Sequence, residues 1–104
     1  MSKKIEFAFN GKNYTLEYTK RTIRAMEAKG FVASDVETKP MTVLPTLFAG
    51  AFLANHKGLS QEVIDEIYEA LDDKEGLIAH LGDMYAEQLE KLTAPGNVVW
   101  KANW

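Results

Sequence analysis

The residues that could do chemistry are few in this sequence, and their spacing does not bring them together. His56 and His80 lie far apart, whereas a metal site needs three or four converging ligands. The acidic run from Glu62 to Glu75 lacks the ligand spacing and glycine of a calcium loop, so it indicates a solvated helix face. We therefore expect no metal site, with His56 near a helix end and His80 facing solvent.

Nucleophiles and cofactor motifs are also missing from the sequence. The chain has no cysteine, which excludes thiol chemistry, disulfide scaffolds and zinc ribbons. Neither glycine-rich phosphate-binding signature occurs, and Ser34 and Ser60 have no motif context that would make them nucleophiles. We predict that the protein is not an enzyme and that it binds no cofactor.

Length and composition indicate one small globular domain. The chain has 104 residues, is 46% hydrophobic and 26% charged, and carries a net charge of −3. These values are ordinary for a soluble domain with a radius of gyration of about 13 Å. We expect the domain to span residues 1–94, with a tail over 95–104. No apolar run follows the first residues, and no stretch is long enough to cross a bilayer, so we expect neither a secretory signal nor a membrane partner.

The elements that position these residues begin with a β-hairpin over residues 3–18. Apolar residues alternate with polar ones on both sides of Asn10-Gly11, a pair that tolerates the positive φ angles of a type I′ turn. A two-residue loop places Phe7 opposite Tyr14, and both fall on the apolar face. A lone hairpin is marginal in water, so this face must pack on another element.

Helical periodicity dominates the rest of the chain. We expect helices at about 20–29, 43–56, 60–71 and 74–93, the first capped by Thr19 and ended by Gly30. Pro45 should lie in the first turn of its helix. A polar connection fills residues 32–40. The predicted fold is α+β and mainly helical, an N-terminal β-hairpin packed on about four α-helices.

Two apolar segments are candidates for a partner surface. Residues 40–56 carry no charge, and Phe48, Phe52 and Leu53 either belong to a central core helix or face a partner. Trp100 and Trp104 lie in the tail, and tryptophan is common among binding hot spots. The alternative for Trp100 is that it folds back as a lid on the core.

Charge is distributed unevenly along the chain. Residues 1–29 carry a net charge of +4 and residues 60–92 a net charge of −8. Basic residues beside Tyr14 and Tyr18 leave nucleic-acid binding open, but the acidic total and the packing role of the hairpin face argue against it. If the two charged parts lie on opposite sides of the fold, they favour head-to-tail self-association.

The N-terminal part resembles a known family. The run from Ile5 to Thr19 contains Asn10-Gly11-Lys12-Asn13-Tyr14 between two strands and leads into a helix that ends near Gly30. Residues 3–31 thus resemble the opening of the tail assembly chaperones of long-tailed bacteriophages and prophages. The resemblance implies a protein of the bacterial host cytoplasm that binds the long, helical tape measure protein during tail assembly. It carries over no catalytic residues. The alternatives are a small phage or prophage structural protein retained in the virion and a nucleic-acid-binding module.

Overall fold

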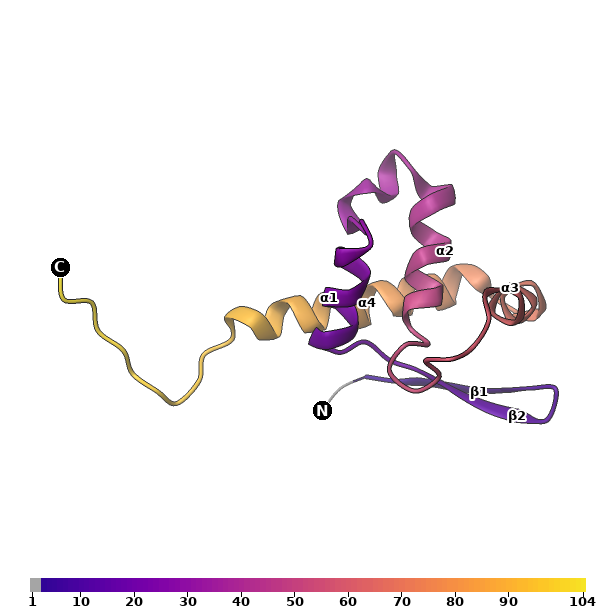
Figure 1. The fold of residues 1–104 in the computed structure, drawn as a ribbon, viewed down its shortest axis with the longest axis horizontal. Coiled ribbons are helices and arrows are strands. Elements are labelled where there is room, and N and C mark those ends of the chain that lie inside the picture. The colour runs from indigo at the N-terminus through magenta and orange to yellow at the C-terminus, as the bar shows by residue number, and fades with distance from the viewer. Residues whose placement is uncertain (1–2) are drawn as a thin grey trace.

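A computed structural model describes residues 3–104 and shows a two-stranded antiparallel sheet followed by helices (Figure 1). The predicted α+β, mainly helical fold is confirmed. The elements in chain order are β1 (Ile5–Phe9), β2 (Lys12–Leu16), α1 (Lys20–Ala28), the 3₁₀ helix η1 (Ala33–Glu37), α2 (Pro40–Gly50), α3 (Gln61–Ala70) and α4 (Lys74–Thr93).

The hairpin has the register expected from its sequence. Phe7 pairs with Tyr14 across β1 and β2, and their rings stack with centroids 5.6 Å apart. Asn10 and Gly11 have φ angles of 50° and 77°, as a type I′ turn requires. The turn and the apolar pattern therefore specify the same pairing.

The outer edge of β2 is covered by the segment that follows α2. The backbone N–H of Thr15 donates to Nε2 of His56 at 3.0 Å, and the N–H of Glu17 donates to the carbonyl of Ala51 at 3.0 Å. His56 also lies against the rings of Tyr14 and Phe52. This segment thus occupies hydrogen-bonding groups that a free strand edge would leave open.

Both ends of α1 form through local hydrogen bonds. Thr19 and Thr22 form a capping box at the start. At the other end the N–H of Phe31 donates to the carbonyl of Met26 and the N–H of Gly30 to that of Glu27, which defines a Schellman motif. Gly30 has a φ of 97°, a conformation that glycine adopts without steric cost.

The region around α2 differs from the sequence-based expectation. Residues 33–37 of the expected polar connection form η1, and α2 spans Pro40–Gly50 instead of 43–56. Pro40 has its φ already fixed for the first helical position, which explains the earlier start. Pro45 therefore lies in the second turn, where it removes one helical hydrogen bond. The helix ends early because residues 51–53 donate to carbonyls three positions back instead of four.

Residues 17 and 18, which directly follow β2, donate hydrogen bonds to carbonyl groups at the end of α2. The hydroxyl of Tyr18 donates to the carbonyl of Leu47 in a buried hydrogen bond between positions 29 residues apart. The carbonyl of Ala51 accepts the hydrogen bond from the N–H of Glu17 that is described above. Because the last carbonyls of a helix have no partner within it, these contacts hold α2 on the hairpin.

Helices α3 and α4 lie within one residue of their expected bounds. Ser60 caps α3 and Asp73 caps α4, each through a side-chain oxygen that accepts from a backbone N–H three positions on. The core lies between the hairpin, the helices α1 to α3 and the part of α4 that ends at Gln88. Its fully buried large side chains are Tyr18, Phe48, Phe52, Leu16, Ile67 and Leu81.

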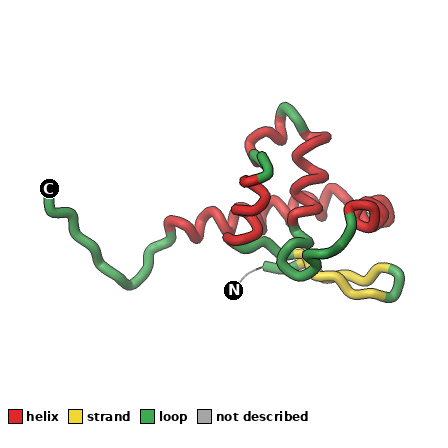
Figure 2. The backbone as a smooth tube through the Cα atoms, viewed as in Figure 1, coloured by secondary structure: helices red, strands yellow, loops and turns green. Residues whose placement is uncertain are grey.

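The last part of the chain extends away from this body. The molecule measures 58 × 32 × 25 Å, and its radius of gyration of 15.9 Å exceeds the value of about 13 Å expected for a globule of this length. The end of α4 and the irregular segment after it account for the elongation (Figures 1 and 2).

Candidate partner-binding surfaces

The aromatic residues of α2 and the turn after it belong to the core. Phe48 and Phe52 are each 1% exposed, and their rings meet edge to face at 5.1 Å. The expectation that they face a partner is therefore wrong, and the core interpretation of this helix is correct for them. Leu53 is half-buried and lines a groove described below. These two rings are packed inside the core, so they are not accessible to a partner.

The two tryptophans lie on the surface. Trp100 is 80% exposed and Trp104 is fully exposed. The alternative that Trp100 folds back as a lid on the core is wrong, because Pro95 follows the end of α4 and the chain continues away from the body (Figure 1). Both tryptophans remain candidates for binding a partner.

We call residues 89–104 the arm. Every residue of the arm is exposed, whereas Leu81, Met84, Tyr85 and Gln88 just before it are buried. Leu89 and Leu92 continue the apolar side of α4 beyond the point where any other element packs on it. The large apolar side chains of the arm are Leu89, Leu92, Val98, Val99, Trp100 and Trp104.

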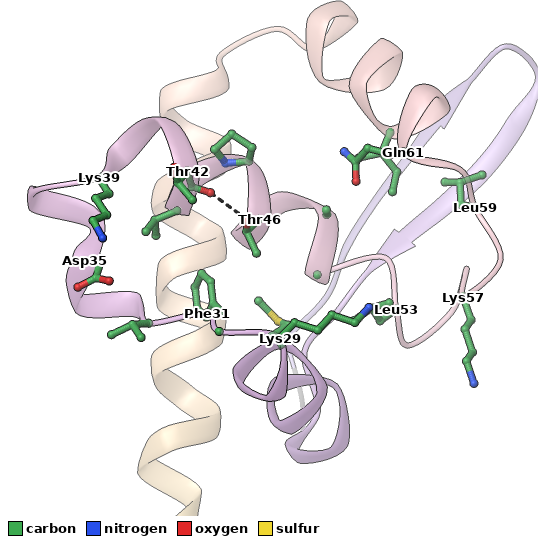
Figure 3. Close-up of a pocket in the computed structure, with 18 residues that line it drawn as sticks. Lys29, Phe31, Asp35, Lys39, Thr42, Thr46, Leu53, Lys57, Leu59 and Gln61 are labelled. Atoms are coloured by element: carbon green, nitrogen blue, oxygen red, sulfur yellow. Dashed lines mark hydrogen bonds between the residues drawn. The ribbon is translucent and has the colours of Figure 1, made fainter.

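A groove lies between α1, η1, α2 and the loop that leads into α3 (Figure 3). It has a volume of about 660 Å³, within the range of sites that hold ligands. Buried apolar side chains form its floor, among them Met26, Val43 and Ile64. Gly50 lies against Met26, and a Cβ at position 50 would come 2.6 Å from the terminal methyl group of that methionine.

Charged side chains surround the groove. Lys29, Lys39 and Lys57 line it together with one acidic residue, Asp35. Figure 3 shows Lys39 and Asp35 on one side and Lys29 and Lys57 on the other. The groove therefore combines an apolar floor with a basic rim, which suits an apolar segment flanked by carboxylates.

The two residues whose pKa is shifted, Tyr18 and Tyr85, lie at neither surface. Burial raises the pKa of Tyr18, and the neighbouring Tyr85 raises it further. Burial also raises the pKa of Tyr85, with a smaller contribution from Glu27. Both tyrosines pack in the core and neither lines the groove, so these shifts reflect structure and provide no acid or base for chemistry.

The histidines and the acidic run have different surroundings. His56 accepts the hydrogen bond from Thr15 described above, a role that its sequence position at a helix end did not indicate. His80 is exposed, as expected. Within residues 3–104 no group of three His, Cys, Asp or Glu side chains is arranged to hold a metal ion.

The acidic face of α3 is solvated. Glu62, Asp65, Glu66 and Glu69 are all exposed. Asp65 accepts a hydrogen bond from Gln61 on the same helix at 2.9 Å.

In the described part of the chain, no helix is long and apolar enough to span a bilayer.

Sequence reasoning found the arm in part and missed the groove. The tryptophans identify the tail, but the helical periodicity of residues 74–93 does not show that Leu89 and Leu92 are left exposed. The groove depends on how η1 meets α1 and α2, and periodicity gives no information on that contact. Lys29, Lys39 and Lys57 lie after three successive elements, α1, η1 and α2, but their positions in the sequence do not show that they line one groove.

Comparisons with known proteins give one match. The family described as "Domain of unknown function (DUF5055)" matches residues 1–104. No curated protein and no solved structure matches the chain.

Proposed function

The chain thus belongs to a family described only as a domain of unknown function, and we propose that it is a tail assembly chaperone of a long-tailed bacteriophage or prophage. In this role it binds the tape measure protein in the host cytoplasm while the tail is assembled. The reaction is one of binding and release, and no covalent step is involved.

The observation that carries this proposal is the exposed apolar surface of the arm. Exposed apolar surface of this extent is typical of protein-binding sites, and tryptophan is enriched among the residues that dominate binding energy. Leu89 and Leu92 are three residues apart on one side of α4, a spacing that suits packing against another helix. A long helical partner offers such a surface along its whole length.

The resemblance of residues 3–31 supports the same function. Its elements are a hairpin with an Asn-Gly turn, a capped helix and a terminal glycine, and each has the geometry described above. The hairpin packs through its apolar face, with Tyr14 and Leu16 buried, so this face is not available to bind nucleic acid. This arrangement favours the chaperone over the nucleic-acid-binding alternative.

Coexpression with the tape measure protein of the same genome tests the proposal. We expect the tape measure protein to be soluble and to copurify with the chain. The double variant Trp100→Ser, Trp104→Ser should remain folded and lose this effect, because both side chains are exposed. Met41→Ser is the matched control, since Met41 is 89% exposed but lies outside the arm and does not line the groove.

Three results would contradict the proposal. An insoluble tape measure protein in the presence of the wild-type chain would exclude the chaperone role. Recovery of the chain in finished virions would favour the structural protein. Binding to DNA or RNA that weakens steeply with salt would favour the nucleic-acid-binding module.

A further inference from the structure

The outer edge of β1 has no partner strand. Thr15 of β2 directs its N–H away from β1, to His56, so Glu6 and Thr15 form one of the alternate pairs that share no hydrogen bond. Ala8 and Asn13 lie two residues along and form a pair of the same kind. The N–H and C=O groups of Glu6 and Ala8 therefore point outward from β1, and in the described part of the chain no segment pairs with them.

The side chains of the hairpin leave the same side open. On the face that packs on the core, Tyr14 and Leu16 of β2 are buried, whereas Ile5, Phe7 and Phe9 of β1 are only half-buried. The apolar face is thus complete on the side of β2 and open on the side of β1. A further strand beside β1 would cover both the open face and the free backbone groups.

The end of the arm has the pattern of such a strand. In residues 97–104 every even position is apolar, and three of the four odd positions are polar. The even positions hold Val98, Trp100, Ala102 and Trp104. Alternation with a period of two is typical of a strand with one buried face, yet this segment is irregular and exposed in the single chain.

We propose that residues 97–102 of one copy add to the β1 edge of a second copy as an antiparallel strand. The contact is heterologous, since one copy offers its arm and the other its β1 edge. It is a head-to-tail association of the kind considered for the charge distribution, but its basis is strand pairing and not the acidic residues of 60–92. Leu89 and Leu92 lie outside the added strand and stay available to the tape measure protein.

The apolar side chains agree with this pairing. When Trp100 lies opposite Phe7, Val98 lies opposite Phe9, and all four side chains are on the same face because opposite residues of antiparallel strands share a face. The half-buried rings of β1 then continue into the apolar side of the arm. Cross-strand aromatic and β-branched pairs of this type stabilise a sheet.

Charge selects the register. The same alignment places Lys101 opposite Glu6 on the other face. A shift by two residues would bring Lys101 opposite Lys4 in one direction and opposite Ala8 in the other. Opposite charges stabilise a cross-strand pair and like charges destabilise it, so the alignment with Glu6 is favoured.

The arm of the same chain cannot reach this position. The N–H of Lys3 donates to Oε1 of Glu87 at 3.4 Å, and from there β1 and the end of α4 run in opposite directions (Figure 1). Phe9 lies about 20 Å along β1 from Lys3, and Ala94 lies about 10 Å along α4 from Glu87. The four residues from Ala94 to Val98 span at most about 14 Å. A second copy must therefore supply the antiparallel strand.

The purified chain tests the inference without any other protein. Both tryptophans of the sequence lie in the arm, so tryptophan fluorescence reports on the arm alone. We expect the mass in sedimentation equilibrium to rise above 11.7 kDa with concentration, and the emission to shift to the blue in parallel as Trp100 packs beside Phe7. The amide hydrogens of Glu6 and Ala8 should exchange more slowly in the same samples, because the added strand accepts hydrogen bonds from them.

Two proline substitutions in the arm form a matched pair. In the proposed ladder the N–H of Val99 points toward β1 and that of Val98 points away from it. Val99→Pro removes a ladder hydrogen bond and should weaken association about tenfold, whereas Val98→Pro should weaken it less. Both residues are exposed and outside the body, so both variants keep the fold. Equal effects would show that the arm does not bind as a strand.

Exchanging the charges tests the register. Glu6→Lys and Lys101→Glu each place like charges opposite one another and should weaken association about fivefold. An equimolar mixture of the two variants, or the double variant alone, restores each pair of opposite charges between copies and should associate like the wild type. Both residues are exposed, so neither change disturbs the core. If neither the mixture nor the double variant recovers, this register is wrong.

Other outcomes would overturn the inference. A wild-type chain that stays monomeric at all concentrations excludes the contact, whether its emission is red or blue. Association that survives Val99→Pro unchanged places the contact outside the arm, for example between two β1 edges. The proposed chaperone function is judged separately, since none of these measurements includes the tape measure protein.

Discussion

Tyr18 connects the hairpin to α2 and offers a sharp test of how the fold is held together. Its side chain is 1% exposed, and its hydroxyl donates to the carbonyl of Leu47, which is also buried. The N–H of Ala51, four positions after Leu47, donates to the carbonyl of Phe48 instead. Tyr18→Phe keeps the ring and its edge-to-face contact with Tyr85 but removes the donor.

The expected cost is that of a buried carbonyl without a partner. Leaving such a group unsatisfied costs about 1–3 kcal/mol, which lowers the melting temperature of a domain of this size by about 4–24 °C. Urea denaturation followed by circular dichroism measures the free energy of unfolding. The midpoint should fall while the m-value stays unchanged, because the core remains packed.

Tyr85→Phe is the matched control. Tyr85 is also in the core, but its hydroxyl makes no hydrogen bond to residues 3–104 and has no buried unsatisfied atom. This variant should change the free energy of unfolding by less than about 0.5 kcal/mol. Equal effects of the two substitutions would refute the reasoning, since they would show that the Leu47 contact contributes nothing specific.

Three further predictions concern pH and local contacts. Because the pKa of Tyr18 is raised in the folded state, its contribution to stability is complete below about pH 10 and falls by about 1.4 kcal/mol per pH unit above it; Tyr18→Phe should flatten this alkaline loss in urea titrations at successive pH values. Gly76→Ala should destabilise α4 by about 1 kcal/mol in thermal melts, because a Cβ there would collide with the capping carboxylate of Asp73; an unchanged melting temperature would contradict this cap. His56→Phe keeps a ring against the hairpin but removes the acceptor of the Thr15 amide, whose hydrogen exchange should become faster than in the wild type.

The parts of the fold governed by local rules could be predicted from the sequence. The turn residues and the apolar alternation specify the register of the hairpin, and Thr19 and Gly30 mark the ends of α1. The bounds of α4 follow from its apolar stripe and its capping aspartate. Each of these features depends on residues within a few positions of one another.

The parts that depend on tertiary contacts could not be predicted in this way. The α2 segment is apolar on most sides, so periodicity did not show which side packs or where the helix ends. Its actual end depends on Glu17 and Tyr18, which are distant in sequence. The last two turns of α4 have the same apolar pattern as the first turns, and only the position of the body shows that Leu89 and Leu92 are left uncovered.

The hydrogen bonds that the hairpin donates to the end of α2 have a consequence for folding. The donors that complete this helix come from Glu17 and Tyr18, so α2 is incomplete as an isolated segment. The hairpin, in turn, obtains from residues 51–56 the partners of its exposed strand edge. Each element therefore needs the other, and we expect them to unfold in one cooperative step, while residues 95–104 of the monomer, which follow α4, exchange their amide hydrogens as freely as an unstructured peptide. In a growing chain the hairpin is synthesised first and gains its full stability only when residue 56 has joined it.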